Sequence, residues 1–135
     1  MREIEFRAKS KFDKNKKWVY GDLIQGENAY ISTKEEFYSA VVSLGGHMST
    51  FVELVDKETI GQYTGIKDKN GTKIFEGDIV KVSGVAKAKI IWNTEDACFA
   101  FDYGKQGRPL CLDLIDDISI EVIGNIYDNP ELLEE

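Results

Sequence analysis

The side chains of this sequence that could carry out chemistry are few and scattered. His47 is the only histidine, and it follows two glycines in a segment expected to be a loop, so the sequence gives little support to a nucleophile–base pair. Cys98 and Cys111 stand between apolar neighbours, which is typical of small buried residues on strands. If the two strands pair, the alternation of side chains allows the two cysteines to be cross-strand neighbours. We still expect both thiols to stay reduced in a cytoplasm.

Acidic side chains gather late in the chain. Asp116 and Asp117 are adjacent and Asp113 precedes them, and paired carboxylates can serve acid–base catalysis or bind cations. The spacing lacks the glycine of a calcium-binding loop, and no Walker A or GxGxxG motif occurs. A solvated turn is the simpler interpretation. We therefore expect no enzymatic activity, no metal site and no cofactor.

Composition indicates a folded, water-soluble protein. The chain has 135 residues, enough for one ordinary domain or two very small ones, and 42% of them are hydrophobic. Its apolar runs are too short for a transmembrane helix. The charged, alternating start does not have the apolar core of a signal peptide. We expect a cytoplasmic protein without a membrane partner.

Charge is unevenly distributed along the chain, whose formal net charge is −7. Residues 1–20 hold seven basic and three acidic side chains, whereas the residues from Pro109 onward hold eight acidic and no basic ones. Lys14, Lys16 and Lys17 form a basic patch that could attract phosphates. The negative total disfavours a nucleic-acid partner, and a solvated surface is the alternative.

The first half of the chain mixes clear and ambiguous signals. Residues Glu3 to Ala8 alternate, and a second strand is expected from Trp18 to about Ile24, after a turn. Helical spacing and a capping box predict a short helix at about residues 34–43, ended by Gly45 and Gly46. A strand is the rival interpretation, because several residues there favour extended structure.

The second half reads as a series of short strands. Asn70-Gly71 between two β-type segments is a strong hairpin signal, since both residues can take positive φ. Glu76-Gly77-Asp78 predicts a corner, and Asn129-Pro130 predicts a final helical turn. Short strands separated by turn residues favour a small barrel; they are expected at Ile79–Val82, Ala86–Trp92, Ala97–Tyr103, Leu110–Leu114 and Ser119–Ile126.

Three segments carry a family resemblance. The central QYTGIKDKNGTKIFEGDIVKV resembles the signature of the YopX family, small proteins encoded by bacteriophages and prophages, and the opening MREIEFRAKSKFDKNKKWVY and closing EVIGNIYDNPELL resemble the ends of that family. The resemblance implies a C-terminal SH3-like barrel, a phage or prophage origin and an intracellular setting. It supplies no activity and no site residues.

These signals together give the expected architecture. We expect a mainly β protein with a short helix. Residues 1–60 form a β-rich segment, residues 61–128 form the SH3-like barrel, and residues 129–135 form a helical tail.

Aromatic residues are the remaining candidates for function. Tyr63 and Tyr103 stand beside turns, where they could be exposed and bind a partner, and Trp92 is a third binding candidate. Ordinary packing is the alternative for all three. We expect a non-enzymatic module that binds a host or phage protein of unknown identity. A nucleic-acid-binding or nucleic-acid-mimicking accessory protein in phage replication or gene control is the alternative. Exposed edge strands leave homo-oligomerisation open.

Overall fold

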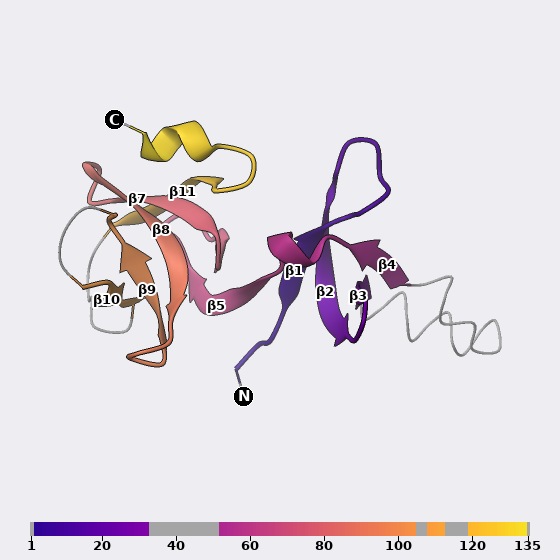
Figure 1. Ribbon diagram of the computed structural model, residues 1–135. Helices are drawn as coiled ribbons and strands as arrows, with labels where there is room; N and C mark the ends of the chain where they lie inside the picture. The colour runs from indigo at the N-terminus through magenta and orange to yellow at the C-terminus, as the bar shows by residue number, and fades with distance from the viewer. Residues whose placement is uncertain (1, 33–51, 105–107, 113–118, 135) are drawn as a thin grey trace. The chain divides into compact units, whose positions relative to one another are not determined.

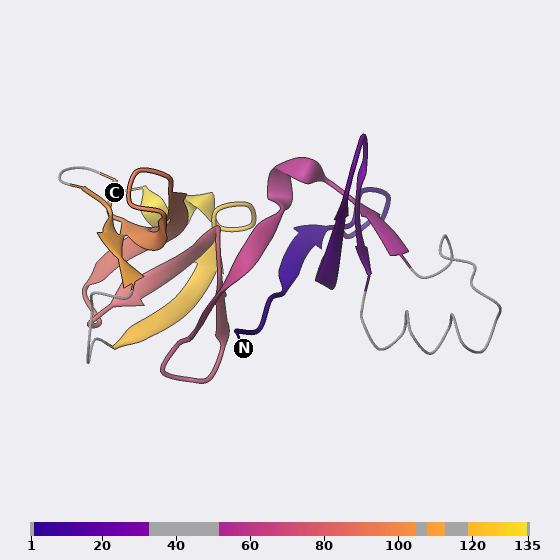
Figure 2. The same ribbon diagram turned by 90° about the horizontal axis from the view of Figure 1, so that it is seen from below.

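A computed structural model describes residues 2–32, 52–104, 108–112 and 119–134 (Figures 1 and 2). The helix expected at residues 34–43, His47 and the acids at positions 113, 116 and 117 lie outside the described residues. The chain divides into two compact units, Met1–Gln62 and Tyr63–Glu135.

The architecture is mainly β, as the sequence predicts. Two antiparallel sheets contain 6 and 5 strands. The helical elements in the described part are two short 3-10 turns, η2 (Lys57–Thr59) and η4 (Pro130–Leu133), and this part contains no α-helix. Nor does any helix there have the length and apolarity needed to span a membrane.

Unit 1 is built on an antiparallel meander. Its strands are β1 (Phe6–Lys9), β2 (Trp18–Gln25), β3 (Ala29–Ser32) and β4 (Val52–Val55), and the full sheet has the order β4-β3-β2-β1-β5-β6. Alternation places Ala8 on one face, where it is buried with Ala29, Ile31 and Val55. The opposite face of β1 presents Arg7 and Lys9, because successive side chains point to opposite sides.

Strand β5 (Gly61–Lys67) contributes to both units. Gly61 and Gln62 pair with β1, whereas Tyr63 and Lys67 pair with β6 (Lys73–Phe75). The predicted hairpin at Asn70-Gly71 is confirmed, but only Gly71 takes a positive φ, of 82°. Gly77, with φ of 94°, and the buried Asp78 make the predicted corner, where the Asp78 carboxylate accepts the backbone N–H of Phe75 at 2.8 Å.

The 5-stranded sheet of unit 2 has the order β10-β9-β8-β7-β11. Its core face holds Val80, Ala88, Ile90 and Phe101, which are buried together with Ile74 of β6. The expected strands are all present in the described residues, where the prediction for β10 can be compared only as far as residue 112. The observed bounds are β7 (Asp78–Val82), β8 (Ala86–Asn93), β9 (Cys98–Asp102), β10 (Leu110–Cys111) and β11 (Ile120–Asn125).

The closed barrel expected from the sequence is not observed in the described ranges, where β10 and β11 are the two edges of an open sheet. The outer edge of β11 is instead met by the β5–β6 turn. The backbone N–H of Lys69 donates to the carbonyl of Ile120 at 3.0 Å, and the Asp68 carboxylate accepts the N–H of Val122 at 2.9 Å. Two such bonds fasten a turn to a strand but do not form a continuous ladder.

The predicted C-terminal helical turn is confirmed as η4, with Pro130 in its first turn. The side chain of Asn129 does not cap this turn; it accepts the backbone N–H of Asn125 at 3.2 Å. Close packing holds the turn against β11, because a Cβ built on Gly124 would lie 2.9 Å from a Leu132 methyl carbon.

Candidate functional site

Trp92 is a large aromatic residue that the core of unit 2 leaves partly uncovered. It lies opposite Phe99 in the β8–β9 pairing, with ring centroids 5.0 Å apart in an edge-to-face arrangement. Alternation along β8 puts it on the same face as the buried Ile90. Because Trp92 lies near the end of β8, 46% of its surface stays exposed.

Leu110 extends this apolar area to the edge of the sheet. It lies on the edge strand β10 opposite Phe101, so its side chain shares the core face, and it is exposed. Phe99 is the diagonal neighbour of Leu110 and is half-buried. We call Trp92, Phe99 and Leu110 the Trp92 face. Sequence analysis identified Trp92 but not Leu110, although the alternation of the expected strand places Leu110 on the same side as the buried Leu112.

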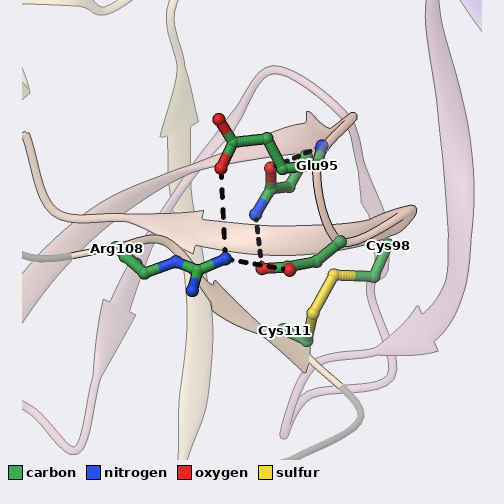
Figure 3. Close-up of a disulfide and its surroundings, with 6 residues drawn as sticks. Glu95, Cys98, Arg108 and Cys111 are labelled. Atoms are coloured by element: carbon green, nitrogen blue, oxygen red, sulfur yellow. Dashed lines mark hydrogen bonds and ion pairs between the residues drawn. A yellow bond between two sulfur atoms is a disulfide. The ribbon is translucent and has the colours of Figure 1, made fainter.

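Two cross-links hold β10 in place beside β9 (Figure 3). Cys98 and Cys111 form a disulfide with their Cα atoms 6.0 Å apart. Both cysteines are half-buried, so the expectation of buried, reduced thiols is wrong. The physical reason is that Cys111 lies opposite Ala100, which puts it diagonal to Cys98 on one face of the sheet. That face is the one opposite the Trp92 face.

The second cross-link is polar and joins the segment before β10 to the β8–β9 turn. The guanidinium of Arg108 donates to the Asp96 carboxylate at 3.1 Å and lies 3.9 Å from that of Glu95. The Asn93 side-chain amide donates to the other oxygen of Asp96 at 3.0 Å. These exposed ion pairs contribute little stability each, but with the disulfide they fix the approach of the chain to Leu110.

The other two aromatic candidates are placed differently. Tyr103 is half exposed, and its ring is 6.3 Å from that of Phe101, so the Ile90–Phe101 row separates it from Trp92. Partial burial raises the pKa of Tyr103 above its ordinary value. Tyr63 is only 5% exposed and packs on Phe75 at 5.6 Å, so the interpretation of Tyr63 as an exposed residue is wrong. Tyr63 lies opposite Phe75 in the β5–β6 pairing, and the contact between the two rings helps to bury it.

The predicted basic patch lies in unit 1, on the loop between β1 and β2. Lys14 and Lys17 are exposed. Lys16 is engaged in the loop itself: its ammonium donates to the carbonyl of Lys11 at 2.6 Å and lies 3.4 Å from the Asp56 carboxylate. The lysines are therefore not equivalent, and Lys16 contributes to local structure.

Asp68 and Asp78 are the buried carboxylates in the described residues, and both bind backbone N–H groups. Burial raises the pKa of Asp68, but hydrogen bonds from the N–H groups of Val122, Thr72 and Asn70 outweigh it and hold the pKa below 3.8. These contacts are architectural. The described ranges also contain no group of three or more His, Cys, Asp or Glu side chains able to hold a metal ion.

Comparisons with known proteins agree with this architecture. A family model described as YopX protein matches residues 5–134. Protein EF1440 from Enterococcus faecalis, known from a crystal structure, is similar in fold with a TM-score of 0.56 and 24% sequence identity, over 99% of this chain and 100% of that chain. No curated protein matches the chain.

Proposed function

This chain belongs to the YopX family, and we propose that it is a non-enzymatic module that binds a host or phage protein. The observation that carries the proposal is the partial exposure of Trp92 on the core face of the unit 2 sheet. Tryptophan is enriched among the residues that dominate protein–protein binding energies.

The Trp92 face has further properties that suit an interface. Its rings are held by packing against each other, so binding would cost little side-chain entropy. Leu110 widens the apolar area toward the edge of the sheet. An apolar centre is the usual anatomy of the middle of an interface.

The proposal also includes the finer description of unit 2 as SH3-like. Its support is the strand order β10-β9-β8-β7-β11, in which a four-strand meander is followed by a last strand that returns beside the first. The β5–β6 turn approaches the open edge of β11 through Asp68 and Lys69. Non-enzymatic action is supported by the engagement of the buried carboxylates in backbone hydrogen bonds.

Affinity capture from a bacterial lysate tests the proposal. The tagged full-length chain and its Trp92→Ala variant are compared after nuclease treatment, with bound proteins quantified by mass spectrometry. We expect one protein to be captured stoichiometrically by the native chain and about 30-fold less well by the variant, the loss typical of a binding hot spot.

Val85→Ala is the matched control, because Val85 is also apolar and is 84% exposed in the turn at the opposite end of β8. It should capture the same protein as the native chain. Capture that both variants reduce equally would indicate general stickiness and contradict the proposal. So would the absence of any protein whose capture survives nuclease treatment.

A further inference from the structure

The loop between β1 and β2 is a second surface, independent of the Trp92 face. It projects beyond the ends of its two strands within unit 1 (Figure 1). Phe12 on this loop is 80% exposed, an unusual state for so large an apolar side chain. It is surrounded in sequence by Lys11, Lys14, Lys16 and Lys17, against the single acid Asp13.

Hydrogen bonds give this loop a defined shape. One oxygen of the Asp13 carboxylate accepts the backbone N–H groups of Asn15 at 3.0 Å and of Lys17 at 3.2 Å. The N–H of Lys11 donates to the carbonyl of Leu54 at 2.9 Å, which ties the loop to β4. Phe12 and the exposed lysines are therefore displayed on an ordered backbone, which lowers the entropy cost of binding a ligand.

Basic and aromatic side chains also lie together on β1 and β2, where these strands enter and leave the loop. Lys9 lies opposite Trp18, and its ammonium is 5.5 Å from the indole centroid. Tyr20 lies on the same face of β2 as Trp18 and is exposed. The basic aromatic surface is defined here as Lys9, Lys11, Phe12, Lys14, Lys17 and Tyr20.

We propose that the basic aromatic surface binds single-stranded nucleic acid without sequence preference. Its lysines would contact phosphates, and the rings of Phe12 and Tyr20 offer flat faces on which unpaired bases stack. Charge complementarity is local, since the chain as a whole carries −7. A single strand, unlike a duplex, offers unpaired bases that can stack on the rings of Phe12 and Tyr20.

Fluorescence anisotropy with a labelled oligothymidylate tests this proposal on the full chain. The association constant K should fall as the salt concentration rises. On a plot of log K against log salt, each phosphate contacted should contribute about −0.7 to the slope. Lys14→Gln combined with Lys17→Gln should reduce that slope by about 1.4. Phe12→Ala should weaken binding by about tenfold and leave the salt slope unchanged, because it removes a stacking ring and no charge.

Lys67→Gln combined with Lys69→Gln is the matched control, since it removes two exposed lysines from the β5–β6 hairpin and should leave affinity unchanged. Polyglutamate, which has charge but no bases, should bind much more weakly than the oligonucleotide. The proposal is overturned if polyglutamate binds equally well, if Phe12→Ala has no effect, or if phosphatidylglycerol vesicles bind and the oligonucleotide does not.

Discussion

The carboxylate of Asp68 accepts a hydrogen bond from the backbone N–H of Val122, a residue 54 positions further along the chain, at 2.9 Å. Its other oxygen accepts the N–H groups of Asn70 at 2.8 Å and Thr72 at 2.9 Å. One buried side chain thus shapes the β5–β6 turn and attaches that turn to β11.

Replacement of Asp68 should destabilise unit 2. Asp68→Ala removes the acceptor of three backbone N–H groups, and we expect the free energy of unfolding to fall by about 2–4 kcal/mol. Urea denaturation followed by tryptophan fluorescence measures this change. Glu95→Ala, which removes only an exposed ion pair, should cost less than about 1 kcal/mol. Equal losses in the two variants would refute the role assigned to Asp68.

The same carboxylate should make stability depend on pH in the acid range. The pKa of Asp68 in the folded chain lies below its ordinary value of 3.8, so the unfolded chain takes up a proton first as the pH falls. The stabilisation is fully present above pH 3.8 and is lost as the pH falls through the lowered pKa. The stability difference between the native chain and Asp68→Asn should therefore be constant near neutrality and shrink below pH 3.8. A difference independent of pH would contradict this assignment.

Opening the disulfide should loosen the attachment of β10. Cys98 and Cys111 are 13 positions apart, and a cross-link that closes a loop of this size contributes about 3 kcal/mol. We expect Cys98→Ser combined with Cys111→Ser to lower the melting temperature. Dithiothreitol should lower the melting temperature of the native chain and leave that of the double variant unchanged. If dithiothreitol left the native melting temperature unchanged, the disulfide would not be a stabilising element.

Substitution of Gly71 should lower the stability of the chain by the conformational cost of holding a residue with a side chain at positive φ. Its φ is 82°, and a Cβ built there meets nothing within 4 Å, so the penalty is purely conformational. Gly71→Ala should cost about 1–2 kcal/mol and Gly71→Asn less, because asparagine visits the left-handed region more readily. Gly26→Ala is the control, since a Cβ there makes only an ordinary contact at 3.9 Å. A larger loss for Gly26→Ala, measured by urea denaturation, would contradict the argument.

Sequence patterns predict the local structure of this chain well. The alternation in β7, β8 and β9 and the turn chemistry of Asn70-Gly71 and Asn129-Pro130 act within a few residues, so they can be read directly. The mainly β class and the membership of the YopX family follow from these same segments.

Features that depend on contacts between distant segments could not be predicted in the same way. Tyr63 borders a turn, yet its pairing with Phe75 buries it. The meeting of Cys98 and Cys111 depends on the register of β9 and β10, and the contact of Asp68 with β11 joins residues 54 positions apart. The exposure of Phe12 could have been predicted from the sequence, because this apolar residue lies among charged turn residues that offer it no apolar neighbours.

Trp92 is exposed because it lies near the end of β8. The alternation puts it on the core face, which alone would predict burial, but the neighbouring side chains do not extend far enough to cover it.

The most direct test of the proposed function is site-specific photo-cross-linking in bacterial cells that express the full chain. A p-benzoylphenylalanine in place of Leu110, which shares the core face of the sheet with Trp92, is compared with the same probe in place of Val85. The account predicts a discrete adduct with one protein from the Leu110 position, none from the Val85 position, and loss of the adduct when Trp92→Ala is added. No adduct at the Leu110 position, or the same adducts at both positions, would contradict the claim that the Trp92 face binds a protein.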